Sequence, residues 1–297
     1  PRAKAWILAN KDNADAAVQP WDHKGYRIPG GNASSPKLAQ LIMGAPAMLR
    51  QKTRGLLPAP EKILDCAVEA ARLDLDTALE VESRGLTYLA VTPEAKNMIS
   101  TFFFGMSKVN GGASRPRGVD KYVTKKVGVL GAGMMGQGIA YVSAMAGIEV
   151  VLKDISADAA ARGKAYTQQL LDKRVARGRM SEEQKQQVLD LIKATAEDAD
   201  LQGCDLIIEA VYEDMGVKAS VFKALDKVAK PGAILASNTS TLDLNQIANF
   251  TTRPADVVGM HFFSPANVMK LLEVVRGAET SKTEIGRASC RERVSSP

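Results

Sequence analysis

Residues 127–136, with the sequence VGVLGAGMMG, decide the fold. The apolar run 127–130 is typical of a buried β-strand, and a glycine-rich turn separates it from a helix-like run. In such a turn Gly131 allows the tight bend, Gly133 the approach of a pyrophosphate, and Gly136 close packing of helix on strand. The helix N-terminus would add amide donors and a positive dipole end. These residues therefore predict a dinucleotide-binding turn.

Asp154 supports this interpretation, because it closes the second predicted strand 23 residues (154 minus 131) after Gly131. A carboxylate there accepts hydrogen bonds from the adenosine ribose and repels a 2′-phosphate, so NAD is favoured over NADP. The alternative is an ordinary glycine-rich turn with Asp154 as a loop charge. Residues 127–148 carry no charged side chain, but their glycines favour strand, turn and helix over a membrane span.

From residue 126 onward, strand-like and helix-like segments alternate, which predicts an α/β fold with a Rossmann-type, mostly parallel sheet. A helical pair over about residues 157–193 restarts at a capping box that begins with Ser181, so we expect an inserted helical hairpin. Residues 61–109 have the apolar spacing of helices. The turn-forming segment 110–118, NGGASRPRG, is the expected domain boundary.

Composition excludes several classes of protein. With 297 residues, 45% of them hydrophobic, the chain can build one or two packed domains. Three widely spaced cysteines and two histidines do not provide a zinc site, so we expect no metal and a reducing compartment. The net charge of +6 comes mainly from residues 1–118, while residues 119–283 hold equal numbers of acidic and basic residues. Without interleaved aromatics or a motif, nucleic-acid binding is not expected.

Two further segments carry candidate chemistry. Residues 237–240, SNTS, follow an apolar strand, where open parallel sheets bind ligands, although a helix N-cap would explain them equally well. His261 begins the sequence HFFSP after another strand-like run, and Glu273 lies in a second run twelve residues later (273 minus 261). A strand, a turn and a returning strand would bring the two together. Histidine is suited to accept a hydroxyl proton near neutral pH, but a lone histidine is more often structural.

The motifs GAGMMG, EAVYE at 209–213, SNTS and HFFSPANVMKLLEVVRG together resemble the L-3-hydroxyacyl-CoA dehydrogenase family, in the form fused behind an enoyl-CoA hydratase. The resemblance covers residues 119 to about 279. It implies NAD-dependent oxidation of (S)-3-hydroxyacyl-CoA to 3-oxoacyl-CoA in fatty-acid β-oxidation. His261 would be the catalytic base, Glu273 its partner, and Ser240 would lie near the substrate hydroxyl and the nicotinamide.

The expected cofactor contacts fall on twelve residues of this sequence. They are Gly131, Gly133, Met135, Gly136, Asp154, Val211, Tyr212, Glu213, Lys218, Asn238, Ser240 and Ser264. Ser264 stands where many simpler members have asparagine, and the resemblance to multifunctional members, which commonly carry serine there, accounts for it.

The resemblance also implies a domain plan. Residues 1–118 resemble the helical end of a crotonase-like hydratase domain with its linker helix, 119–283 the NAD-binding dehydrogenase domain, and 284–297 the translation of a sequencing adapter outside any domain. We expect a fragment truncated at both ends, without hydratase activity, which hydration of crotonyl-CoA would contradict. The alternative function is an NAD-binding module with little or no turnover. In the family an all-helical domain follows and closes over the acyl-CoA, and we do not expect that domain within this sequence.

The implied partners are the 3-hydroxyacyl-CoA substrate and, for the parent enzyme, a thiolase subunit or a second copy. The implied location is the cytoplasm of a bacterium, or the peroxisome of a eukaryote.

Overall fold

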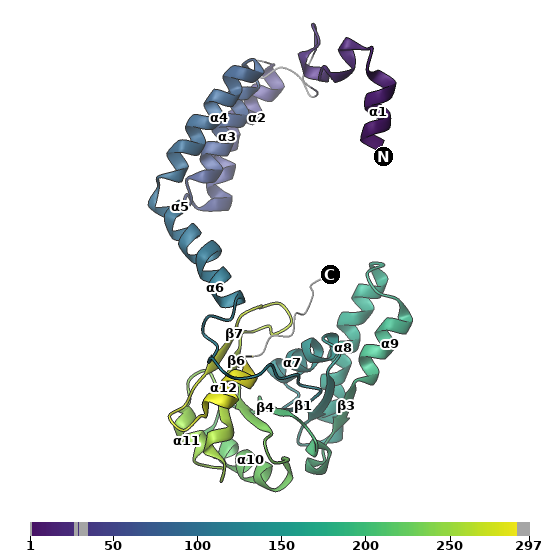
Figure 1. Ribbon diagram of the computed structural model, residues 1–297, viewed down its shortest axis with the longest axis vertical. Coiled ribbons are helices and arrows are strands. Elements are labelled where there is room, and N and C mark those ends of the chain that lie inside the picture. The colour runs from purple at the N-terminus through teal and green to yellow at the C-terminus, as the bar shows by residue number, and fades with distance from the viewer. Residues whose placement is uncertain (1, 27–28, 30–34, 290–297) are drawn as a thin grey trace. The chain divides into compact units, whose positions relative to one another are not determined.

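The computed structural model describes residues 2–26, 29 and 35–289, which form two compact units, one up to Gly111 and one from Gly112 (Figure 1). The first unit is helical. Its elements are α1 Arg2–Asn10, η1 Ala14–Ala17, η2 Pro20–Asp22, α2 Pro36–Thr53, α3 Ala59–Ala70, α4 Leu75–Ala90, α5 Pro93–Met98, the π-helical η3 Ile99–Gly105 and α6 Met106–Asn110. No residue that the structure describes in this unit is buried.

The second unit is built on a seven-stranded sheet with the order β3-β2-β1-β4-β5-β6-β7. Neighbouring strands run parallel throughout, except that β7 is antiparallel to β6. The strands are β1 Lys126–Leu130, β2 Glu149–Lys153, β3 Ile192–Thr195, β4 Leu206–Glu209, β5 Ile234–Ser237, β6 Val257–Phe262 and β7 Leu272–Val275. The predicted Rossmann-type α/β fold is therefore confirmed.

Helices cover both faces of this sheet. They are α7 Met134–Met145, α8 Ala157–Ala176, α9 Glu182–Asp190, η4 Asp198–Leu201, α10 Met215–Val228, α11 Leu244–Ala248, η5 Pro254–Asp256 and α12 Lys282–Ala288. Alternate strand residues point to opposite faces, so Val129 packs with Ile139 of α7 in one core, and Ile207 packs with Phe222 of α10 in the other. Among the described residues, no helix is long and apolar enough to cross a membrane.

The predicted helical hairpin is present as α8 and α9, which lie side by side in Figure 1. The capping box is confirmed, because the Ser181 hydroxyl accepts from the Gln184 N–H and the Gln184 side chain accepts from the Ser181 N–H. The hairpin is shorter than expected, since residues 192–195 form β3 beside β2 instead of ending the helix. A strand of four residues is too short to show a period, and its signal is limited to the β-branched Ile192 and Thr195.

The segment set aside as a foreign tail is folded as far as Ser289. Within α12, Ile285 packs against the same core as α7, and Gly286 lies against Val119. Arg287 is hydrogen bonded to Glu284 at 2.8 Å and stacks 4.0 Å from the Tyr122 ring centroid. These residues therefore belong to the fold of the second unit, whatever their origin. Residues 290–297 of the predicted tail lie outside the described part of the chain.

Candidate active site

The glycine turn between β1 and α7 has the geometry that its sequence predicts. Gly131 has φ +91°, and a Cβ added there would lie 2.5 Å from the Ala210 carbonyl oxygen. A Cβ on Gly136 would lie 1.7 Å from the Gly131 carbonyl oxygen, so the first helical turn packs directly on the bend. A Cβ on Gly133 would meet no atom within 4 Å, and no side chain caps α7 there. Open space above Gly133 and an uncapped helix N-terminus fit a bound pyrophosphate.

Asp154 follows β2 and lies beside this turn. Its Oδ2 accepts a hydrogen bond from the Ala132 N–H at 2.6 Å, and its Oδ1 accepts one from the Ile155 N–H at 2.7 Å. The carboxylate thus fixes the glycine turn as well as lying where an adenosine ribose is expected. The sequence motif indicated its position but not this bond to the turn, which joins the ends of two neighbouring strands.

The SNTS segment is held at the carboxyl end of β5 from two sides. The Asn238 Oδ1 accepts from the Phe262 N–H at 2.9 Å, which ties the segment to the residue after His261. On the other side, the Ser240 N–H donates to Glu213 Oε1 at 3.0 Å. The Thr239 hydroxyl accepts from the Leu242 N–H, so part of this motif does close a local turn. The N-cap of the following helix is Asp243, whose side chain accepts from the Asn245 N–H, so SNTS itself closes only a local turn and lies at the carboxyl end of β5.

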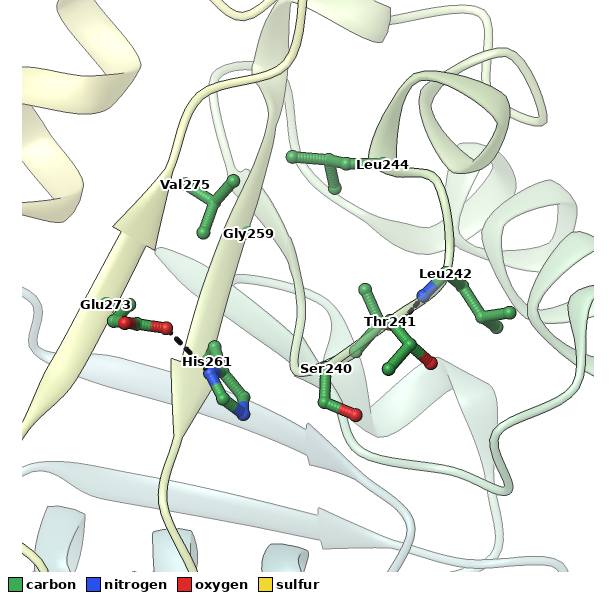
Figure 2. Close-up of a pocket in the computed structure, with 9 residues that line it drawn as sticks. Ser240, Thr241, Leu242, Leu244, Gly259, His261, Glu273 and Val275 are labelled. Atoms are coloured by element: carbon green, nitrogen blue, oxygen red, sulfur yellow. Dashed lines mark hydrogen bonds and ion pairs between the residues drawn. The ribbon is translucent and has the colours of Figure 1, made fainter.

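His261 and Glu273 are directly opposite each other in the antiparallel register of β6 and β7. The His261 Nδ1 lies 2.9 Å from the Glu273 Oε2, as Figure 2 shows. In the neutral imidazole, Nδ1 carries the hydrogen that an ionised Glu273 carboxylate accepts, and Nε2 keeps its lone pair. The arrangement leaves one ring nitrogen able to accept a proton.

A small hollow of about 150 Å³ lies next to this pair. Figure 2 shows Ser240 on its far side from Glu273, with the His261 ring between them. Its other lining residues are Thr239, Thr241, Leu242, Leu244, Gly259 and Val275. The predicted base, its carboxylate partner and the predicted hydroxyl group thus border one cavity at the carboxyl edge of the sheet.

Sequence reasoning missed a buried ionic network behind this edge. Glu209 and Lys218 have side chains that are 0% and 1% exposed, and Lys218 Nζ lies 2.7 Å from Glu209 Oε1. Lys218 Nζ also lies 3.0 Å from Glu213 Oε2, while Ser237 Oγ donates to Glu209 Oε2 at 2.7 Å. Burial alone raises the pKa of Glu213, but hydrogen bonds from Thr239 and Lys218 outweigh it, so its pKa lies below the usual value. Glu209 appeared in the EAVYE motif, yet its complete burial has no sequence signature.

Comparison with known proteins identifies the second unit. The model for "3-hydroxyacyl-CoA dehydrogenase, NAD binding domain" matches residues 126–290, more than half of the chain. The chain belongs to this family. Its cofactor is therefore NAD, in agreement with the glycine turn and Asp154.

Several known proteins are similar to this chain over most of its length. A "fatty acid oxidation complex subunit alpha" from Pseudomonas entomophila is 35% identical, with 94% of this chain and 43% of that protein covered. One from Shewanella baltica is 39% identical, covering 81% and 34%. The chain thus spans less than half the length of these relatives.

Solved 3-hydroxyacyl-CoA dehydrogenase structures resemble part of the chain. A 3-hydroxybutyryl-CoA dehydrogenase from Escherichia coli is 39% identical, with a TM-score of 0.53, and covers 55% of this chain and 34% of that one. The dehydrogenase part of multifunctional enzyme 1 from C. elegans is 33% identical, with a TM-score of 0.52, and covers 58% and 40%.

The other residues that the dehydrogenase resemblance singles out occupy different environments. Ser264 Oγ lies 3.7 Å from the Met134 sulfur, which places it beside the first residue of α7. Tyr212 is 81% exposed after β4, whereas Val211 packs against the core. Met135 packs against the other core, and Lys218 is inside the fold. The structure therefore brings Ser264 and Tyr212 to the edge of the sheet and leaves Lys218 behind it.

Proposed function

We propose that this chain performs the NAD-dependent oxidation of an (S)-3-hydroxyacyl-CoA to the 3-oxoacyl-CoA in fatty acid oxidation. The observation that supports this proposal best is the His261–Glu273 pair, with its 2.9 Å hydrogen bond beside a hollow at the carboxyl edge of the sheet. The glycine turn opens at the same edge, because β1 and β6 run in the same direction through the sheet. A base and a dinucleotide site on one edge suit the oxidation of an alcohol.

In this mechanism His261 Nε2 accepts the proton of the substrate 3-hydroxyl. The Glu273 carboxylate holds the ring in the required tautomer and stabilises the imidazolium that forms. The Ser240 hydroxyl, on the same hollow, donates to the substrate oxygen and orients it toward Nε2. Bound NAD supplies the acceptor for the hydride that leaves the carbinol carbon.

The cofactor would be held by the two halves of the sheet. We assign the pyrophosphate to the turn at Gly131, Gly133 and Gly136, and the adenosine ribose to Asp154. On the other half, Tyr212, Glu213, Asn238 and Ser264 would contact the nicotinamide part, together with backbone near Met135 and Val211. Lys218, buried behind them, would act through Glu213.

The remaining parts of the proposal concern the whole protein. We infer from its relatives that it functions as the alpha subunit of a fatty acid oxidation complex. The resemblance to multifunctional enzymes adds a thiolase subunit or a second copy as partner, and the cytoplasm of a bacterium or the peroxisome of a eukaryote as location. The domain plan stays part of this proposal, with a hydratase-derived segment before residue 119 and the dehydrogenase domain after it. The alternative for this chain by itself is an NAD-binding module with little turnover, because lid or domain closure commonly excludes water from such sites.

Two measurements test the proposal, NADH titration by fluorescence and NADH-dependent reduction of acetoacetyl-CoA. His261→Ala should lower kcat by about 10²- to 10⁴-fold, because it removes a general acid–base group, while the Kd for NADH stays unchanged. The matched control is His23→Ala, the other histidine of the sequence, which lies exposed in the first unit. Binding without turnover in the wild-type chain would favour the module, and equal activity of both variants would contradict the assigned base.

A further inference from the structure

The buried network at the ends of β4 and β5 has an unusual charge balance. Two carboxylates, Glu209 and Glu213, share one ammonium, that of Lys218. Burying such ions is costly unless every charge is paired and hydrogen bonded. Glu209 meets this requirement through Lys218, the Ser237 hydroxyl and the Val211 N–H. A fully paired buried network of this kind fixes the geometry of the groups it holds.

The network extends from the interior to the hollow at the edge. Lys218 lies between Glu209, which is completely buried, and Glu213, whose side chain is 38% exposed. Glu213 in turn accepts hydrogen bonds at its Oε1 from the Thr239 hydroxyl and from the Ser240 N–H. The buried pair thus contacts the exposed carboxylate that holds the backbone of Ser240.

Lys218 is placed for a positioning role. Its side chain is 1% exposed, and its ammonium is directed to two carboxylates. Without this cation, the partly exposed Glu213 carboxylate would be held through Oε1 alone, by the Thr239 hydroxyl and the Ser240 N–H. With the cation present, one carboxylate oxygen is held on Lys218 and the other on residues 239 and 240.

We propose that Glu209 and Lys218 are a buried positioning pair, which fixes the Glu213 carboxylate on the Thr239–Ser240 backbone and so sets the position of Ser240 at the hollow. The functional consequence rests on the proposed function, since it assigns the substrate oxygen to Ser240. The mechanical part, that the pair restrains the Ser240 amide, stands independently of any ligand.

Amide hydrogen exchange at Ser240 in the ligand-free protein tests the mechanical part. The double variant Glu209→Gln/Lys218→Met removes both buried charges and keeps similar side-chain shapes, so it avoids an unpaired buried ion. We expect exchange at the Ser240 amide to rise by about tenfold, because a charge-assisted hydrogen bond is lost. Exchange at Ile207 and Leu235, in the middle of β4 and β5, should stay protected. Unchanged Ser240 exchange in the folded double variant would overturn the proposal.

A second ion pair on the same strand region serves as the control. Asp205 precedes β4 and binds Lys230 Nζ at 2.5 Å, and it also accepts from the backbone N–H groups of Lys125 and Lys126. The variant Asp205→Asn/Lys230→Met therefore breaks a carboxylate–ammonium pair that also braces neighbouring strands. Its effect should be confined to the amides at the start of β1, with Ser240 exchange unchanged. Equal effects of both double variants on Ser240 would reduce the proposal to general loosening of the fold.

The route through Glu213 is tested by combining variants. Glu213→Ala removes the acceptor of the Ser240 N–H at a partly exposed site, so it should raise Ser240 exchange by about tenfold. Added to the double variant, it should change exchange by less than about twofold, because coupled residues are not additive. If the two effects multiply, the pair does not act through Glu213.

Folding and function are separated by two additional readouts. Should the double variant not fold, Glu209→Gln/Lys218→Gln replaces it, since it removes the cation from Glu213, keeps hydrogen-bonding groups in the interior and should raise Ser240 exchange by roughly threefold. In the reductase assay the folded Glu209/Lys218 double variant, which keeps Glu213, should lower kcat more than it raises the KM for NADH. An inactive wild-type chain would count against the proposed function and leave the exchange result intact. Lys218→Met alone leaves the Glu209 carboxylate unpaired in the interior. If adding Glu209→Gln to it restores thermal stability and kcat to the same extent, the pair has a purely structural role.

Discussion

The His261–Glu273 pair depends on the strand register more than on the chemistry of either residue. Its partners are 12 positions apart in the sequence (273 minus 261) and are opposite each other because β7 returns antiparallel to β6. A slip of one residue would turn Glu273 to the other face of the sheet and break the pair. The sequence HFFSP, with Glu273 in the next apolar run, indicated that a returning strand could bring the two together, and the family resemblance implied the pair. The role of each residue stays a prediction.

Glu273→Gln tests the role of the carboxylate charge. The glutamine oxygen can still accept the Nδ1 hydrogen, so the tautomer is kept, but the imidazolium loses its counter-charge. We expect kcat for acetoacetyl-CoA reduction to fall by roughly 10- to 100-fold, with an unchanged Kd for NADH. Glu279→Gln, an exposed residue after β7, is the matched control. An unchanged kcat would show that Glu273 does not assist His261.

At the scale of elements, the sequence predicted those that are strongly buried or strongly capped. The apolar runs of β1, β4 and β5 are almost completely buried, and α9 begins with a capping box. By contrast, β3 has four residues, with Lys193 exposed and Ile192 buried. Its formation depends on pairing with β2 and not on local preference. No sequence pattern indicated the Glu209–Lys218 pair either, because burial of a charge depends on which elements meet in space.

The glycine turn allows folding and cofactor binding to be separated within one element. Gly136→Ala places a Cβ where the Gly131 carbonyl oxygen lies, so the backbone must shift, and we expect a loss of about 1–3 kcal/mol in unfolding free energy. Gly133→Ala has open space and a φ of −70°, so it should fold normally. Its methyl group would instead occupy the pyrophosphate site and weaken NADH binding by about tenfold or more.

Thermal unfolding and NADH titration of the two variants distinguish these effects. Gly44→Ala, on a helix of the first unit where a Cβ meets no atom within 4 Å, controls for the substitution itself. If Gly133→Ala binds NADH as the wild type does, the pyrophosphate does not lie against this turn. If Gly136→Ala is as stable as the wild type, the turn can relax without cost.

On the scale of the whole molecule, the two units differ sharply in what holds them together. All three hydrophobic cores among the described residues are built from residue 127 onward. The helices before Gly111 leave large apolar side chains exposed, with Phe102, Phe103 and Phe104 each more than half exposed. Because burial of apolar surface is the main favourable contribution to folding, cooperative stability should reside in the second unit.

Deletion of residues 1–111 tests this division. The remaining chain from Gly112 keeps the complete sheet, both of its covering layers and α12, so its melting temperature should change by no more than about 4 °C. Its affinity for NADH should be that of the longer chain, since every proposed cofactor contact lies after residue 130. Binding of the apolar dye ANS should fall, because the exposed apolar side chains of the first unit are gone. A large drop in melting temperature, or loss of NADH binding in the folded shorter chain, would show that the helical unit supports the dehydrogenase fold.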